Sequence, residues 1–410
     1  MTEENTENTE NTENTENTAD STEQVKKKVF ITGITGQDGF YLSQYLLDKG
    51  YDVYGMLRRN SQRNLGSLQM LPTAVLSNIK FVYGDVTDPV AVQSAIRIVN
   101  PAEIYHLAAM SFVGTSWDLA HEALEVNLMG TLNVLNGMLN GARNAKLFVA
   151  GSCDMYGKND FRLQNETTPC TPSSPHGTSK LAVFNLVKNY REAYGLFAVT
   201  GILFNHESPF RNVEYLTKKV TQAAAWLSCG MTGTLKLGDV TPVRDWGFAG
   251  DTVRAMHAML QLEKPEDFVV ATGESHSVEF LVKEAFSSVG LDYSKFIEKT
   301  DSLRRVVEVP YLCGDSSKLR KATGWEPTVP FKQLITALVN NEVVAYQRRV
   351  FEEERTKEWI ASQVPSVADA AEASASDAAA VSESAPSPES APSSEEAVVE
   401  TVSAETQAPE

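Results

Sequence analysis

The sequence predicts an α/β protein with a Rossmann-type doubly wound parallel sheet and a smaller C-terminal substrate-binding domain. Short β-rich runs alternate with longer amphipathic stretches through the first half of the chain, which is typical of a parallel sheet with helices on both faces. A glycine-rich turn follows the first of these runs. Past about residue 205, Pro and Gly become more frequent and the alternation weakens, which favours a second domain.

The strand-like and helix-like segments have clear limits. We expect strands at residues 29–34, 53–57, 79–86, 103–109, 146–150 and 198–204. We expect helices at residues 39–49, 89–99, 119–139 and 179–194. Gly50 follows the first helical segment directly and is well placed to end it.

The acidity of the 410-residue chain lies in its two ends. Residues 1–24 carry eight acidic side chains and residues 365–410 carry ten, and neither segment contains Lys or Arg. The first is an Asn-Thr-Glu repeat and the second is rich in Ala, Ser, Glu and Pro, so we expect disordered tails. The 340 residues between them are almost neutral, which argues against a nucleic-acid partner.

The sequence gives no sign of a membrane protein. It contains no run of eighteen apolar residues and no basic, then apolar, leader at its N-terminus. Its four cysteines form no CxxC pair, so we expect reduced thiols and no metal site. These features predict a cytoplasmic protein without a membrane partner.

The glycine-rich turn predicts a dinucleotide site. Gly33, Gly36 and Gly39 have the spacing that lets a backbone turn sharply and approach a pyrophosphate. Gln37 and Asp38 lie within the same turn, at the expected start of a helix whose free N–H groups favour an anion. Because the turn follows the first strand of an alternating chain, we expect all five residues at the cofactor.

The ends of the next strands indicate which cofactor is bound. An NAD site usually has an acidic residue after the second strand, whereas this chain has Arg58 and Arg59. Paired guanidinium groups suit a 2′-phosphate, so we expect NADP. Asp85, at the end of the third strand, is a candidate to accept a hydrogen bond from the adenine amino group, although it could equally cap a turn; Val86 beside it is also expected at the cofactor. Leu107, Ala108 and Ala109 at the end of the fourth strand complete the predicted cofactor site.

These motifs, together with a lysine at position 180, resemble the extended short-chain dehydrogenases/reductases. Three stretches resemble the GDP-mannose 4,6-dehydratases in particular: RRNS at 58–61, LFNHESP at 203–209 and RDWGFAGDTVRAM at 244–256. The resemblance covers residues 26–343 and implies an NADP-dependent lyase acting on a GDP-hexose, with GDP-mannose as the first candidate. Such an enzyme oxidises C4, eliminates water across C5 and C6, and returns the hydride to C6, giving a GDP-4-keto-6-deoxyhexose.

The resemblance also places four catalytic residues. Ser152 keeps the hydroxyl expected near the C4 oxygen, and Asp154 keeps a carboxylate where the family has a longer glutamate. The family's Tyr-x-x-x-Lys pair is here His176 and Lys180, so the lysine is kept and the tyrosine is not. Three interpretations follow: His176 is the C4 base; or the chain binds NADP and a GDP-sugar without turnover; or it reduces or epimerises C4 of a related sugar.

The nucleotide-sugar contacts implied by the resemblance are spread along the chain: Ser111, Asn205, Glu207, Lys219, Arg244, Arg305 and Glu308. Phe210, Phe248 and Thr252 depart from the family's pattern. We expect tails at 1–24 and 365–410, a mainly NADP-binding domain at 25–204, a mainly GDP-sugar-binding domain at 205–345 and a C-terminal helix at 346–364. The family further implies a homodimer or homotetramer.

Overall fold

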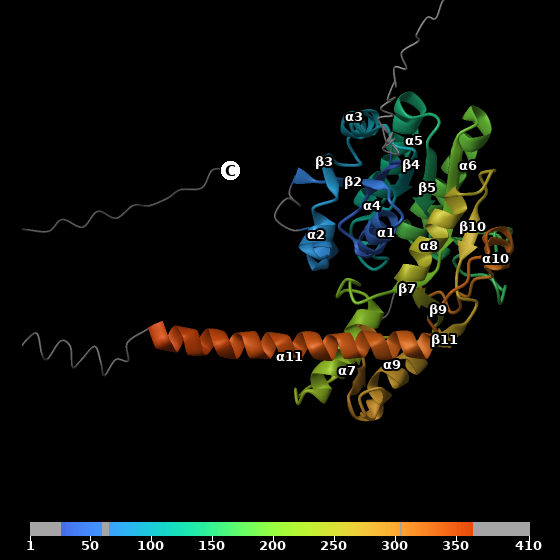
Figure 1. Cartoon of the computed structure of the whole chain (residues 1–410). Helices are drawn as coiled ribbons and strands as arrows, with labels where there is room; N and C mark the ends of the chain where they lie inside the picture. The colour runs from blue at the N-terminus through green and yellow to red at the C-terminus, as the bar shows by residue number, and fades with distance from the viewer. Residues whose placement is uncertain (1–25, 60–64, 304–305, 364–410) are drawn as a thin grey trace, which may run out of the picture. The chain divides into compact units, whose positions relative to one another are not determined.

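The computed structural model describes residues 26–59, 65–303 and 306–363 (Figure 1). The predicted tails therefore lie outside the described residues, as does Arg305. The chain divides into two compact units, one up to Gln347 and one from Arg348. In the described part of the chain, no helix is both long and apolar enough to cross a membrane.

The first unit is built on a seven-stranded sheet in the order β10-β6-β5-β4-β1-β2-β3, in which every neighbouring pair is parallel. Its strands are β1 (Lys28–Thr32), β2 (Asp52–Leu57), β3 (Lys80–Tyr83), β4 (Glu103–His106), β5 (Lys146–Ala150), β6 (Phe197–Leu203) and β10 (Phe268–Val270). The strand order reverses between β1 and β4. Ligands of doubly wound sheets bind beyond the carboxyl ends of the strands at such a switch point.

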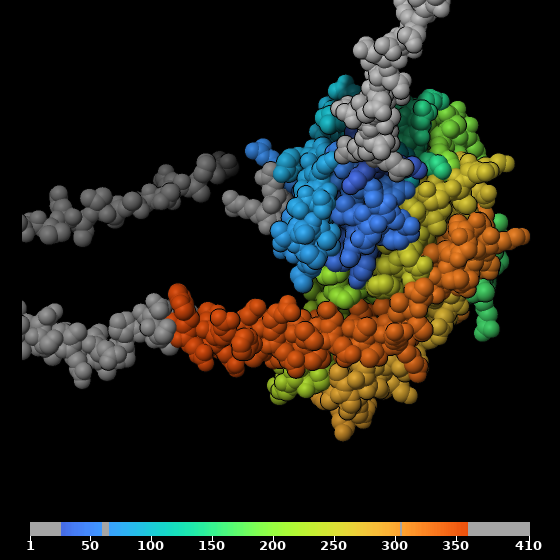
Figure 2. Space-filling view, in the orientation of Figure 1, coloured from blue at the N-terminus to red at the C-terminus, as the bar shows by residue number. Residues whose placement is uncertain are grey.

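Helices cover both faces of this sheet, as the sequence predicts (Figure 1). The elements before β6 are α1 (Gln37–Asp48), α2 (Thr73–Leu76), α3 (Pro89–Val99), α4 (Ala120–Leu124), η3 (Glu125–Met129), α5 (Gly130–Gly141) and α6 (Pro175–Tyr194). Along β1, Val29 and Ile31 pack with α1 and with α8 (Ala249–Leu260), whereas Phe30 packs with α3, α5 and α6. Figure 2 shows α1 (blue) directly against α8 (yellow) at the surface.

Two of the helices that differ from their predicted limits do so in ways that shape the site. The helix expected at 179–194 begins at Pro175, because Ser174 caps it by accepting a hydrogen bond from the Gly177 N–H and proline suits the first helical position. The helix expected at 119–139 is instead α4 and α5 joined by η3, a π-helical turn. Such turns often occur at functional sites.

The C-terminal half adds smaller elements to the sheet. They are β7 (Asn205–Glu207), α7 (Leu216–Ser228), β8 (Leu235–Leu237), β9 (Val243–Phe248), β11 (Ser275–Ser277), α9 (Val278–Ser287), β12 (Ile297–Lys299), α10 (Ser317–Thr323) and α11 (Phe331–Gln363). The helix predicted at 346–364 is thus longer and begins at Phe331. Strands β11, β9 and β7 form one small sheet, and β12 and β8 form another.

A buried ion pair holds the C-terminal end of α6 against the sheet. Arg191 donates two hydrogen bonds to Asp267, at 2.9 and 2.6 Å, and Asp267 also accepts the Thr200 N–H at 2.7 Å. Removing one partner of a buried pair leaves the other charge uncompensated. We therefore expect Asp267→Ala to lower the free energy of unfolding by about 3–5 kcal/mol in denaturant titrations.

The same helix offers a matched control for this prediction. Glu192 forms an ion pair with Lys188 at 4.0 Å, and both side chains are more than half exposed. Exposed pairs contribute at most about 1 kcal/mol, so Glu192→Ala should leave the unfolding midpoint almost unchanged. Equal midpoints for the two variants would contradict the stabilising role of Asp267.

Candidate active site

A cavity of about 1410 Å³ opens at the carboxyl ends of β1 to β6. It is lined by most of the predicted site residues: Gly33, Gly36, Gln37, Asp38, Arg58, Asp85, Val86, Leu107, Ala108, Ala109, Ser111, Ser152, Asp154, His176, Lys180, Asn205, Glu207, Lys219, Arg244 and Glu308. Gly39 and Arg59 are not among its lining residues. Within the described ranges, no group of three or more His, Cys, Asp or Glu side chains could hold a metal ion.

The glycine-rich turn fits a dinucleotide backbone. Gly33 has a φ of 73°, and a Cβ there would lie only 2.6 Å from the Ala108 nitrogen. Gly39 is required for close packing of the helix against the turn, since a Cβ there would lie 2.1 Å from the Ile34 carbonyl oxygen. Gly36 caps α1 and lines the cavity, which leaves the N-terminus of this helix facing the space where a pyrophosphate would lie.

Gln37 and Asp38 connect this turn to the second half of the chain. Gln37 donates to the His206 carbonyl at 3.0 Å and accepts from the Ser208 hydroxyl at 2.7 Å. The His206 ring forms an ion pair with Asp38 at 2.9 Å. Burial opposes the charged carboxylate, but His206 holds the pKa of Asp38 below its ordinary value of 3.8. These two side chains therefore join the turn to β7, a role that the motif itself did not predict.

The residues after β2 and β3 occupy different parts of the site. Arg58 is exposed and lines the cavity, whereas Arg59 is exposed outside it. Asp85 lines the cavity and accepts two hydrogen bonds from Thr87, at 3.0 Å from its N–H and 2.9 Å from its hydroxyl. Oδ1 of Asp85 thus caps a turn, as one of the two interpretations expects, and contact with an adenine stays a prediction.

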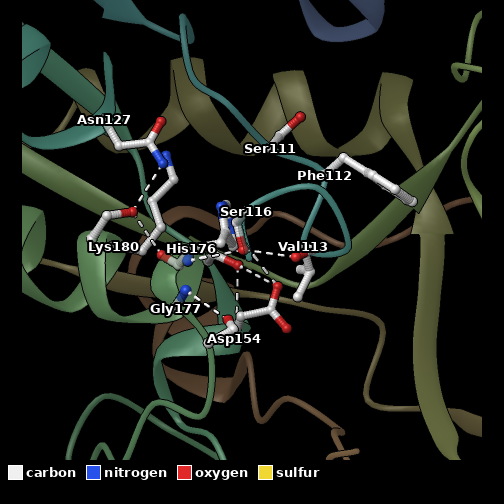
Figure 3. A network of polar contacts seen from close by, with 12 residues as sticks. Ser111, Phe112, Val113, Ser116, Asn127, Asp154, His176, Gly177 and Lys180 are labelled. Carbon is white, nitrogen blue, oxygen red and sulfur yellow. Dashed lines mark hydrogen bonds and ion pairs between the residues drawn. The ribbon is translucent and has the colours of Figure 1, made fainter. Parts of the chain in front are cut away.

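His176 and Lys180 lie on one face of α6 because they are four residues apart in its first two turns. The Nδ1 of His176 lies 3.0 Å from the Met110 carbonyl oxygen, and this contact requires that Nδ1 carry the proton. The Nε2 atom is then an acceptor, and it lies 3.7 Å from Oδ2 of Asp154 (Figure 3). The ring is almost fully buried, with 3% of the side chain exposed.

Asp154 lies in the short helix η4 (Cys153–Met155) directly after β5. Ser152 caps this turn, accepting the Asp154 N–H and donating its hydroxyl to Oδ2, both at 3.2 Å. The Asp154 side chain is 21% exposed and so remains accessible from the cavity. Hydroxyl, carboxylate and imidazole are thereby gathered at the end of one strand.

Burial lowers the pKa of His176 from its ordinary 6.5, and Lys180 lowers it further, while Asp154 acts in the opposite direction. Burial also lowers the pKa of Lys180 to about 8. The Lys180 Nζ atom donates to the Ala150 carbonyl at 2.7 Å. At neutral pH the site therefore contains a neutral imidazole next to a charged ammonium group.

Sequence reasoning missed the residue that fixes the loop opposite His176. Asn127, in the π-helical turn η3, accepts the Met110 N–H at 2.8 Å and donates to the Met110 carbonyl at 3.2 Å. It also donates to the Ser179 hydroxyl at 2.9 Å (Figure 3). Asn127 thus positions the carbonyl that selects the His176 tautomer, and no local motif marks it.

Three of the predicted nucleotide-sugar residues form ion pairs with other side chains. Glu207 is buried and forms an ion pair with Arg211 at 3.2 Å, so Arg211 is a further cavity residue that the sequence did not reveal. Glu308 forms an ion pair with the buried Arg244 at 2.7 Å. Arg244 and Glu308, an expected cation and an expected carboxylate, therefore neutralise each other's charge.

Three departures from the family pattern, at Phe210, Phe248 and Thr252, lie outside the lining of the cavity. Phe210 packs against Phe40 with ring centres 4.1 Å apart, and both Phe210 and Phe248 contact the Tyr41 ring. Neither these two residues nor Thr252 is among the lining residues of the cavity in the described structure. Phe210 and Phe248 therefore belong to an aromatic cluster with Phe40 and Tyr41 rather than to the cavity wall.

Comparisons with known proteins identify the family of this chain. The sequence pattern of the family described as GDP-mannose 4,6 dehydratase matches residues 30–338. The chain is 41% identical over 331 residues to GDP-mannose 4,6 dehydratase 2 of Arabidopsis thaliana, covering 79% of this chain and 88% of that one. It is also 41% identical over 339 residues to the human GDP-mannose 4,6 dehydratase, covering 76% and 90%.

Solved structures share the fold at lower sequence identity. The Thermus thermophilus UDP-glucose 4-epimerase, in complex with NAD, has a TM-score of 0.66 and 25% identity over 77% of this chain and 98% of that one. The Bacillus anthracis dTDP-glucose 4,6-dehydratase, also with NAD, has a TM-score of 0.66 and 21% identity over 77% and 96%. From the family match and the sequence relatives, the chain belongs to the GDP-mannose 4,6-dehydratase family.

Proposed function

We propose that this protein dehydrates a GDP-hexose, with GDP-mannose as the first candidate, to the GDP-4-keto-6-deoxyhexose. The observation that carries the proposal is the grouping of Ser152, Asp154 and His176 at the end of β5, in the cavity that the glycine-rich turn also lines. The sequence relatives, which are named for this dehydration, support the same reaction.

The chemistry of these side chains matches the demands of the reaction. A bound nicotinamide dinucleotide would accept the hydride from C4 and later supply it to C6. His176 takes the proton of the C4 hydroxyl at Nε2, because Nδ1 is bound to the Met110 carbonyl. Ser152 donates a hydrogen bond to the C4 oxygen. The resulting ketone acidifies C5, and Asp154 removes the C5 proton as water leaves from C6.

Proton NMR of the purified protein with NADP⁺ and GDP-mannose tests this function. A new C6 methyl doublet is the expected result, because only the complete oxidation, elimination and reduction cycle creates that group. If no doublet forms while calorimetry shows that both ligands bind, the protein is a binding homologue or acts on another GDP-sugar. A changed C4 configuration without a methyl group would identify an epimerase instead.

We further propose that the cofactor is NADP rather than NAD. The support is Arg58, which lines the cavity directly after β2, together with the lack of an acidic residue at this strand end. Arg58→Ala is expected to weaken NADP⁺ binding about 10- to 150-fold, the loss typical of a charged hydrogen bond, and to leave NAD⁺ binding almost unchanged.

Calorimetric titrations with both cofactors measure this change in preference. Arg97→Ala in the last turn of α3 is a matched control, because it removes an exposed arginine that does not line the cavity. An equal loss of affinity for NADP⁺ and NAD⁺ in Arg58→Ala would contradict a 2′-phosphate contact. The same titrations with Arg59→Ala show whether the second arginine contributes to NADP⁺ binding, as the sequence predicts.

The proposed homodimer or homotetramer is supported by the family resemblance alone. Light scattering on the purified full-length chain measures its molar mass directly. A mass of two or four chains is expected, and a monomer at micromolar concentration would contradict the proposal.

A further inference from the structure

Tyr215 is a candidate acid–base residue that no sequence motif indicates. It directly precedes α7, on the segment that continues from β7. Among the tyrosines of residues 26–59, 65–303 and 306–363, Tyr215 alone lines the cavity. His176 occupies the position of the family's tyrosine, so the described cavity takes its phenol group from another segment of the chain.

The contacts of Tyr215 hold its ring in a defined place. Its hydroxyl lies 2.7 Å from the hydroxyl of Ser111, which is exposed to the cavity. The Arg211 guanidinium stacks on the ring with its carbon 3.6 Å from the ring centre, and Arg211 forms an ion pair with Glu207 at 3.2 Å. The edge of Phe112 completes the contact, with ring centres 5.3 Å apart.

The phenol is a proton donor at neutral pH. Burial raises the pKa of Tyr215 above its ordinary 10, although Arg211 and the Ser111 hydroxyl both favour the phenolate. The carboxylates of Glu207 and Asp154 also raise this pKa. Tyr215 and the proposed base for C5 line the same cavity, and Ser111, the partner of Tyr215, directly follows Met110, whose carbonyl contacts His176 beside Asp154.

Loss of water from C6 needs an acid as well as a base, because hydroxide is a poor leaving group. The groups on the β5 and α6 side are committed to other tasks. The Ser152 hydroxyl, which here donates to Asp154, turns to the C4 oxygen in the proposed reaction, and the Lys180 ammonium donates to the Ala150 carbonyl. Across the cavity, Tyr215 and Ser111 form a pair of neutral hydroxyl groups that can pass a proton between them.

We propose, on the basis of the function proposed above, that Tyr215 is a catalytic residue that gives its phenol proton to the departing C6 hydroxyl. In this step the C5–H bond breaks and its proton goes to Asp154, while the electron pair forms the C5–C6 double bond. The C6–O bond breaks, and the hydroxyl takes the Tyr215 proton and leaves as water. The phenolate regains a proton through Ser111 from solvent, so that no net charge accumulates.

The test compares two events in Tyr215→Phe, which keeps the ring and removes only the hydroxyl. Exchange of the C5 hydrogen with D₂O reports the action of Asp154 on the ketone, and the methyl doublet reports the loss of water. We expect C5 exchange to persist while product formation falls about 10²–10⁴-fold, the usual contribution of a general acid. Ser111→Ala should show the same separation with a smaller loss.

Tyr293→Phe is the matched control, because the Tyr293 phenol contacts Glu279 at 3.5 Å and does not line the cavity. It should retain wild-type rates of both events. Equal loss of exchange and product in Tyr215→Phe, or weaker binding of GDP itself, would show a structural role and overturn the inference. An unchanged product rate would overturn it as well and leave the dehydratase function intact. A wild-type protein without product would instead contradict the function and this step together.

Discussion

Replacing Asp154 with asparagine is expected to lower the rate of 6-deoxy product formation about 10²–10⁴-fold. The amide has nearly the same size and can still accept the Ser152 hydroxyl, which lies 3.2 Å from Oδ2 in the wild-type protein. It cannot, however, accept a proton from C5. The loss should therefore appear in turnover, measured from the growth of the methyl doublet, and not in the affinity for GDP-mannose.

The exchange experiment shows which step Asp154 serves. Asp154→Asn should lose exchange of the C5 hydrogen with D₂O together with product, unlike Tyr215→Phe, in which exchange continues. Asp160→Asn changes an exposed carboxylate in the same segment between β5 and α6 and should behave as wild type. Rapid C5 exchange in Asp154→Asn would mean that another group is the base.

The sheet could be predicted because its signals are local. Residues 146–150 and 89–99 form a strand and a helix with the predicted limits, since each segment is bounded by residues that start or stop it. Asp88 caps the second by accepting two N–H groups, and Asn100 ends it in the left-handed conformation. The glycine-rich turn and the catalytic segments are likewise read from neighbouring residues.

The rest of the site depends on contacts between distant segments. Tyr215 meets Ser111 across 104 residues, and His206 meets Asp38 across 168. Asn127 acts through a π-helical turn that hydrophobic periodicity does not distinguish from an ordinary helix. The ion pair of Arg244 with Glu308 joins residues 64 positions apart. None of these contacts leaves a pattern within a short window of sequence.

His176→Gln is expected to reduce both C5 exchange and product formation by about 10²–10⁴-fold, because both events require the C4 ketone. Glutamine can still donate a hydrogen bond to the Met110 carbonyl, as Nδ1 of His176 does at 3.0 Å, but it offers no basic nitrogen. His121→Gln is the matched control, since His121 is 95% exposed on α4. Full activity of His176→Gln would contradict the assignment of the C4 base.

The pH dependence of turnover gives an independent test of His176 and Lys180. His176 acts in its neutral form, and burial lowers its pKa below 6.5, so activity should persist at pH 6.5 and fall only at lower pH. Lys180 acts in its charged form, and burial lowers its pKa to about 8, so activity should fall as the pH rises through 8. A lysine with its ordinary pKa of 10.5 would keep the rate constant over that range. Constant turnover from pH 8 to pH 10 would show that the charged Lys180 side chain is not required. Arginine stays charged over this range, so a decline in turnover near pH 8 that disappears in Lys180→Arg would assign the loss of activity at alkaline pH to Lys180.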